Sequence, residues 1–239
     1  MNLFKQTTAA KAPDQEAGLV EWFVDEFWPR YGKQAVYVLA AIAVVVGASV
    51  WYNNGRVEQQ GKENKELGQA FVYYSEDKLD SAEGFLTAFV KSSHSRLVQD
   101  KANLMLGQIG YAKGKYDEAI KAFTSVDLTD TQHPLVSSGA LHGLASCYIM
   151  DKNYPLAAET LEKFVSTFGR RSASPQEKVA GKEVVDLSPA VPNALWKLTL
   201  VYKELKNADK EKAAAQKLIS IYPESRESFD ATRLLAQIP

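Results

Sequence analysis

Few side chains in this 239-residue sequence could carry nucleophilic chemistry. Cys147 is the only cysteine, and His142 precedes it by five residues within a predicted helix. Because a helix turns about 100° per residue, side chains five residues apart point in quite different directions. The two residues therefore do not form a thiolate–imidazole pair. We expect Cys147 to be a buried structural residue, and an enzyme centred on His142 is only a minor alternative.

Two other histidines and one acidic cluster were considered as metal or acid–base sites. His94 lies in the sequence SSHS and His133 precedes a proline, so both are expected in solvated turns without companion metal ligands. Asp77, Asp80 and Glu83 lie close together, but the glycine that a calcium loop needs at its bend is missing. The chain also has no Gly-rich phosphate loop, paired-His motif or nucleophile elbow. We therefore predict no catalytic residue, no metal, no cofactor and no small-molecule substrate.

Composition predicts a helical protein that does not bind nucleic acid. The 28 basic and 29 acidic residues give a net charge of -1, which leaves no large basic surface to neutralise phosphates. Ala, Leu, Lys, Glu and Gln recur throughout, whereas strand-favouring runs are scarce after residue 53. A single cysteine cannot form an internal disulfide. The predicted fold class is all-α.

One apolar stretch is long enough to suggest a membrane span. Residues 35–52 read AVYVLAAIAVVVGASVWY and contain no charge, and at 1.5 Å per residue they would extend about 27 Å. Trp28 and Tyr31 precede the stretch and Trp51 and Tyr52 end it, as in an aromatic belt. We predict a single transmembrane helix at 35–52. A cleaved signal peptide is less favoured, since more than 30 residues come first.

The predicted span divides the chain into an N-terminal segment, residues 1–34, and a larger domain, residues 53–239. The first segment contains a short amphipathic helix that ends before Pro29, with acidic residues opposite its apolar side. Such a helix would dock on a protein, lie in the membrane interface or simply cap the span. Basic residues flank the span on both sides, so charge does not set its orientation.

Internal repeats follow the predicted span. Residues 138–169 and 192–223 align without a gap at an offset of 54, matching Leu141 with Leu195 and Tyr148 with Tyr202. The segment that starts at residue 100 aligns with the first of these at an offset of 38. Each unit has two apolar helical patterns separated by a short polar break, which predicts stacked antiparallel hairpins. Small residues such as Gly107 are expected where the two helices of a hairpin touch.

The segments GQIGYAKGKYDEAIKAF, GLASCYIMDKNYPLAAETLEKF and LWKLTLVYKELKNADKEKAAAQKLISIYPES resemble tetratricopeptide repeats. The resemblance implies an α-solenoid of about three to four helical hairpins. A further degenerate hairpin is expected from Glu63 to Ser92 and a capping helix at 224–238. Residues 170–191 between the second and third units, rich in Ser, Pro and charge, are expected to form a long connection.

Tetratricopeptide proteins generally bind peptides or helices in a groove lined by the first helix of each hairpin. Carried onto this chain, the protein-binding groove comprises Lys101, Leu104, Gln108, Tyr111, His142, Ser146, Ile149, Trp196, Leu200 and Lys203. The Lys and Asn clamp that co-chaperones of the family use for a terminal carboxylate is replaced here by other residues. An apolar partner segment is therefore expected, unless neighbouring helices or residues 170–191 cover the groove.

The whole arrangement, a short segment, one span and a helical-repeat domain, resembles the ancillary subunit of the bacterial Sec translocon. The resemblance implies a single-pass protein of the bacterial inner membrane, with residues 1–34 cytoplasmic and 53–239 periplasmic. The expected function is a membrane-anchored scaffold that recruits a translocon, chaperone or envelope-assembly subunit. The alternative is a structural component of a cell-envelope assembly, held by its span and N-terminal helix.

Overall fold

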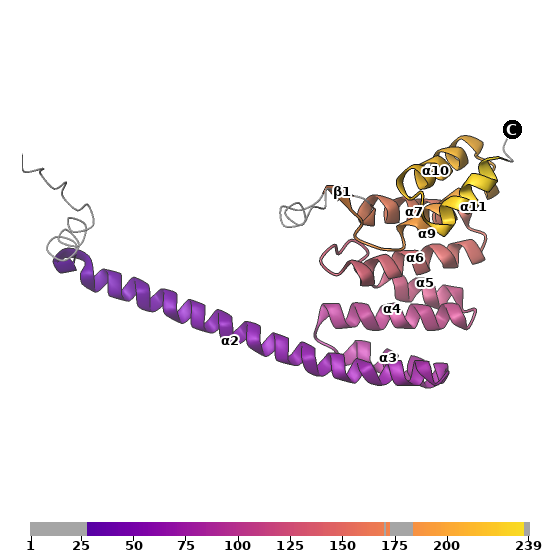
Figure 1. Ribbon diagram of the computed structural model, residues 1–239. Helices are drawn as coiled ribbons and strands as arrows, with labels where there is room; N and C mark the ends of the chain where they lie inside the picture. The colour runs from indigo at the N-terminus through magenta and orange to yellow at the C-terminus, as the bar shows by residue number, and fades with distance from the viewer. Residues whose placement is uncertain (1–27, 170, 173–183, 237–239) are drawn as a thin grey trace, which may run out of the picture. The chain divides into compact units, whose positions relative to one another are not determined.

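The computed structural model describes residues 28–169, 171–172 and 184–236 (Figure 1). Helix α2 (Trp28–Ser75) is the first described element. The structure gives only the backbone of residues 28–33, 35–36 and 39–40 of this helix, and only the backbone of the two short strands at 171–172 and 184–185. The chain divides into two compact units, residues 1–58 and 59–239. The predicted amphipathic helix of the N-terminal segment falls almost entirely on residues 1–27, outside the described residues.

The predicted membrane span is not supported. Within the residues that the structure describes, no helix is long and apolar enough to cross a membrane. The expected location as a single-pass inner-membrane protein with a periplasmic domain is contradicted.

The second unit is a stack of helical hairpins. Its helices are the part of α2 from Gln59 onward, α3 (Leu79–Ser92), α4 (Arg96–Ala112), α5 (Tyr116–Thr124), α6 (Pro134–Met150), α7 (Tyr154–Phe168), α9 (Val191–Glu204), α10 (Ala208–Ile221) and α11 (Arg226–Leu235). Consecutive helices pair as α4–α5, α6–α7 and α9–α10, and α11 packs on the last pair (Figure 1). Helices α2 and α3 pair through a shared core that includes Leu67 and Leu86. Four hairpins among the described residues confirm the predicted solenoid.

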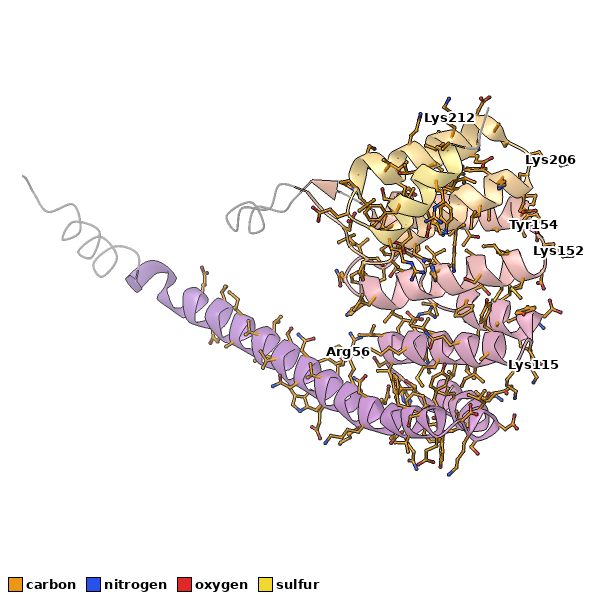
Figure 2. The ribbon with its side chains drawn as sticks, turned by 45° about the vertical axis from the view of Figure 1, so that its right-hand side comes forward. Arg56, Lys115, Lys152, Tyr154, Lys206 and Lys212 are labelled. Atoms are coloured by element: carbon orange, nitrogen blue, oxygen red, sulfur yellow. The ribbon has the colours of Figure 1, made fainter. Side chains whose placement is uncertain are left out.

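The four hairpins share one turn. Asp77, Gly114, Lys152 and Lys206 all have positive φ, between 54° and 73°. In each turn the next residue donates its backbone N–H to a carbonyl of the first helix, as Asn153 does to Tyr148 O at 2.8 Å. Gly114, Lys152 and Lys206 are separated by the offsets of 38 and 54 found in the sequence, and Figure 2 shows the turn residues Lys115, Lys152 and Lys206 along one edge.

Proline and asparagine mark the starts of several helices. Pro134, Pro155 and Pro192 occupy the first turns of α6, α7 and α9, where a missing N–H costs no hydrogen bond. Asn153 and Asn207 precede α7 and α10, and their side chains accept from the backbone N–H three residues later, at 3.4 and 3.1 Å. Asn153 and Asn207 are separated by the repeat offset of 54 residues, and they have the same capping role.

Small residues let a buried ring join two hairpins. Phe123 of α5 is 1% exposed, and a Cβ added at Gly107 of α4 would lie 2.4 Å from its Cε1. A Cβ at Gly143 of α6 would lie 2.3 Å from its Cζ. Phe123 thus packs against the backbones of two successive first helices, which is possible only because both positions lack a side chain. Ala119 and Ala157 are also fully buried.

The long connection between α7 and α9 includes a small ladder. Strands β1 (Arg171–Ser172) and β2 (Val184–Val185) pair antiparallel, with Arg171 opposite Val185. Leu187 N then donates to Phe168 O at 2.9 Å, which ties the end of the connection to α7. The described part of the chain is therefore all-α apart from two strands of two residues each.

Candidate functional site

The predicted groove residues lie on the first helices of three hairpins. We call this surface the A-helix face: Lys101, Leu104, Gln108 and Tyr111 of α4, His142, Ser146 and Ile149 of α6, and Trp196, Leu200 and Lys203 of α9. On each helix these positions recur every three or four residues, so they share one side. Gln108 and Lys203 are exposed.

Polar side chains join α6, α9 and α11 on the A-helix face. His142 Nε2 lies 2.9 Å from Asn193 Oδ1, and Asn193 Nδ2 donates to Glu227 Oε1 at 3.4 Å. One turn further along, Lys197 Nζ donates to Ser146 Oγ at 2.8 Å. These bonds cross between successive hairpins, so they fix the register of the first helices against one another.

The earlier hairpins are joined by one polar and one apolar contact. Lys101 Nζ of α4 donates to Asn64 Oδ1 of α2 at 3.0 Å. Between α4 and α6, Leu104 lies over Gly139, where an added Cβ would meet both Leu104 methyl groups at 3.4 Å. Lys101, Leu104, His142 and Ser146 of the predicted groove thus contact neighbouring helices of the protein itself.

The pair of His142 and Lys197 is electrostatically unusual. Burial lowers the pKa of Lys197. Burial also lowers the pKa of His142, and the positive charge of Lys197 adds to this effect, while the hydrogen bond with Asn193 opposes it. Because Lys197 donates to a neutral hydroxyl and no ion pair joins it to a carboxylate of the described residues, the A-helix face carries a half-buried cation without a counter-charge.

The apolar residues of the A-helix face differ in accessibility. Tyr111 and Leu200 are each 37% exposed, and the Tyr111 ring lies 5.7 Å from that of Tyr116. Ile149 and Trp196 are partly buried and pack against the core of the last two hairpins. The face therefore offers two open apolar contacts, and its other apolar members are backed by the core.

Sequence reasoning missed Lys197 and Asn193. Both lie on α9, one and three residues from Trp196, and they make the contacts that join α9 to its neighbours. A signal was present, because Lys197 interrupts the apolar run LWKLTL and an isolated charge in such a run needs a polar partner.

The side chains considered for catalysis have structural surroundings. Cys147 is fully buried, and burial, with the nearby charge of Asp151, raises the pKa of its thiol to about 11. His133 Nδ1 lies 2.7 Å from Asp130 Oδ2 at the turn before α6. Over the described ranges no group of three metal-binding side chains is gathered. Nothing in this part of the chain indicates catalysis.

The acidic cluster at the start of α3 is part of an inter-hairpin ion pair. Lys113, at the end of α4, contacts both Asp80 and Glu83, the latter at 2.6 Å. The two carboxylates raise the pKa of Lys113, and its ammonium in turn lowers theirs. The cluster therefore stabilises the contact between the first two hairpins.

Comparison with known proteins identifies the repeats. Two family models described as tetratricopeptide repeat match residues 100–128 and 193–225. They correspond to the α4–α5 hairpin and to α9 and α10, which confirms the resemblance seen in the sequence. No curated protein matches the chain. The comparisons give no support to the resemblance to the ancillary Sec subunit.

Solved structures of low sequence identity share the fold. A tetratricopeptide repeat protein from Parabacteroides merdae ATCC 43184 is 17% identical, with a TM-score of 0.55 over 74% of this chain and 59% of that one. A putative kinesin light chain from Podosopora anserina, described as having nearly identical TPR-like repeats, is 17% identical, with a TM-score of 0.54 over 74% of this chain and 85% of that one. MamA from Desulfovibrio magneticus RS-1 is 17% identical, with a TM-score of 0.50 over 74% of this chain and 93% of that one. The described second unit is a tetratricopeptide-like solenoid, a fold that indicates a scaffold for binding other proteins.

Proposed function

We propose that the protein is a non-catalytic adaptor that binds a partner segment along the A-helix face. The observation that carries this proposal is Lys197, a half-buried cation without a carboxylate partner among the described residues, beside a face that also exposes two apolar groups, Tyr111 and Leu200. A buried charge without a counter-ion is costly. A partner carboxylate at Lys197 would relieve that cost, and apolar side chains of the same segment would cover Tyr111 and Leu200.

The expected partner is an apolar segment that also carries an acidic residue. This refines the expectation from the sequence, in which the face was apolar only. The narrower expectation of a translocon, chaperone or envelope-assembly subunit as partner rests on the resemblance alone, and the identity of the captured protein tests it directly.

The test is site-specific crosslinking followed by substitution in the full chain. Photoreactive residues at positions 111 and 200 should give the same partner adduct, whereas one at the exposed position 212 of α10 should not. Tyr111→Ala and Leu200→Ala should then reduce co-purification of that partner. Leu205→Ala is a matched control, because Leu205 has the same 37% exposure at the end of the same helix.

Lys197→Met tests the electrostatic part of the proposal. The substitution should weaken binding of the partner while leaving the fold intact, since Met fills a similar volume without the charge. Co-purification that survives the Tyr111, Leu200 and Lys197 substitutions alike, or that falls equally in the Leu205 control, would show that this face is not the binding surface.

A further inference from the structure

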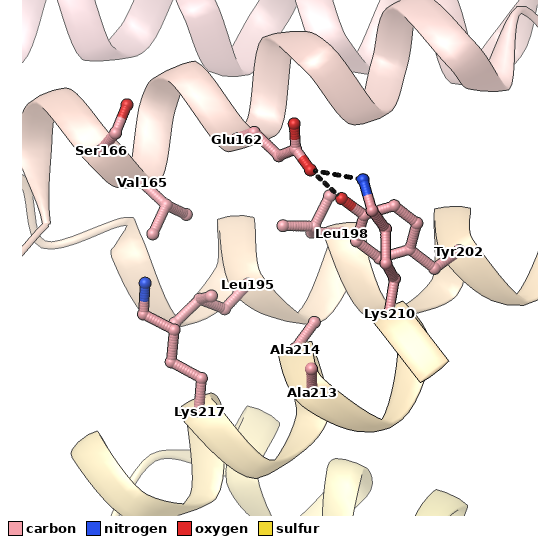
Figure 3. A pocket seen from close by; sticks show the side chains of 10 residues that line it. All are labelled: Glu162, Val165, Ser166, Leu195, Leu198, Tyr202, Lys210, Ala213, Ala214 and Lys217. Atoms are coloured by element: carbon pink, nitrogen blue, oxygen red, sulfur yellow. Dashed lines mark hydrogen bonds and ion pairs between the residues drawn. The ribbon is translucent and has the colours of Figure 1, made fainter. Parts of the chain in front are cut away.

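A second, separate site lies between the second helices of the last two hairpins. A pocket of about 270 Å³ opens between α7 and α10 (Figure 3). Its floor is formed by Leu195 and Leu198 of α9, and its walls include Val165 of α7 and the small Ala213 and Ala214 of α10. Because alanines stand where larger side chains would fill the space, the pocket presents an apolar floor to solvent.

The pocket does not share its residues with the A-helix face. Leu195, Leu198 and Tyr202 form one stripe of α9, whereas Trp196 and Leu200 form another, about 145° away at 100° per residue. Substitutions on α10 therefore leave the A-helix face untouched.

Fixed charges close one end of the pocket. The carboxylate of Glu162 accepts hydrogen bonds from the Tyr202 hydroxyl and from Lys210 Nζ, the latter at 3.3 Å (Figure 3). Lys210 Nζ also lies 5.1 Å from the centroid of the Tyr202 ring. Glu162 and Lys210 neutralise each other, so this end offers no free charge to a ligand.

The opposite end carries a free cation. Lys217 projects from α10, and Figure 3 shows its amino group directed toward Val165 of α7. No ion pair joins it to a carboxylate anywhere in the part of the chain that the structure describes. The lining therefore has a net charge of one positive unit, placed at the end of an apolar floor.

We propose that this pocket is a second protein-binding site, which takes a partner segment with one large apolar side chain over Leu195 and Leu198 and a carboxylate at Lys217. The volume is below the usual 300–1,000 Å³ of small-molecule sites, which enclose most of their ligand. It suits one side chain of a polypeptide whose remainder stays outside. The site would give the adaptor two faces, and it does not depend on the A-helix face being occupied.

The test is peptide selection on the full chain. A display library of random 12-residue peptides is first depleted on the Ala213→Leu chain, whose added side chain fills the pocket at an exposed position. It is then selected on the wild type, and the recovered peptide is synthesised with its acidic residue intact or changed to the amide. The expected peptides pair an aromatic or leucine side chain with Asp or Glu.

The affinities should separate the apolar contact from the charge. Ala213→Leu should lower the affinity for the peptide about ten- to a hundredfold, the equivalent of losing one buried apolar side chain. Lys217→Gln should lower the affinity for the acidic peptide about two- to fivefold, as expected for an exposed ion pair. The amide peptide should bind the Lys217→Gln and wild-type chains equally. Lys212→Gln, an exposed lysine of the same helix, should change nothing.

Three results would overturn the proposal. One is that selection recovers no peptide, and another is that the recovered peptides bind the Lys217→Gln and wild-type chains equally. The third is that octanoate shifts the amide resonances of Leu198 and Ala214 while no peptide does, which would assign the pocket to a small apolar acid.

Discussion

Glu63 is the side chain whose removal should most clearly weaken the first hairpin. It lies on α2, is 4% exposed, and accepts four hydrogen bonds. Oε2 accepts from Ser93 Oγ at 2.6 Å and Ser95 N at 3.1 Å, and Oε1 accepts from Gln59 Nε2 and His94 N, each at 3.0 Å. Glu63 therefore fastens α2 to the loop between α3 and α4.

The magnitude of this effect follows from the pKa of the carboxyl group. Burial by itself would raise the pKa of Glu63, but hydrogen bonds led by that of Ser93 lower it from 4.5 to about 2. A difference of that size corresponds to at most about 3 kcal/mol of stability. Because solvent near the surface screens part of the interaction, we expect Glu63→Gln to cost about 1–2 kcal/mol at pH 7.

The dependence on pH gives the prediction its sign. A carboxyl group whose pKa is lower in the folded state contributes its full stabilisation above the unfolded value of 4.5. That contribution is lost as pH falls from about 4.5 toward 2, because over this range the unfolded chain binds a proton at Glu63 that the folded chain does not. The difference between wild type and Glu63→Gln should therefore be constant from pH 7 to pH 5.5 and shrink at pH 3.

The assay should report on the first hairpin as well as the whole chain, since repeats can open separately. Urea unfolding followed by circular dichroism gives the global free energy, and amide hydrogen exchange in α3 gives the local one. Glu66→Gln is the control, because it removes the same charge from an exposed position of the same helix. The reasoning fails if both variants lose equal stability, or if the Glu63 effect persists unchanged at pH 3.

Three further predictions concern packing, the repeated turn and the A-helix face. Gly107→Ala should destabilise the protein by about 1–3 kcal/mol in urea unfolding, because the new methyl group overlaps the buried ring of Phe123. Lys152→Gly should stabilise it by about 0.5–1 kcal/mol, because φ is 58° there. Burial and Lys197 lower the pKa of His142 in the folded state, so the unfolded chain binds more protons as pH drops below 6.5 and stability should fall. Thermal unfolding of His142→Gln should show less of this loss.

Each of these predictions has a direct control. Gly84→Ala in α3 has no atom within 4 Å of the added Cβ, so it should not destabilise, and Phe123→Leu should restore part of the loss in Gly107→Ala. Lys163→Gly, within helix α7, should destabilise where Lys152→Gly stabilises. An unchanged pH profile in His142→Gln would show that this histidine is not the group responsible.

The repeat architecture was predictable because local patterns specify it. The offsets of 38 and 54 residues recur in the positive-φ residues Gly114, Lys152 and Lys206, since each hairpin needs the same turn and the same small contacts. Gly107 was expected at a helix contact, and the structure shows why, through Phe123. The predicted span is not supported, because no helix in the described part of the chain is long and apolar enough to cross a membrane.

The sequence by itself determined the repeated helices and their pairing into hairpins, because these depend on spacing within one segment. The side of α4, α6 and α9 that binds a partner stays a prediction. Only the tertiary structure decided which of those side chains are free, because that depends on contacts between segments distant in the sequence. His142 contacts Asn193, and Lys197 contacts Ser146, each 51 residues away. The pocket between α7 and α10 likewise exists only because two helices that are not adjacent in the chain flank α9.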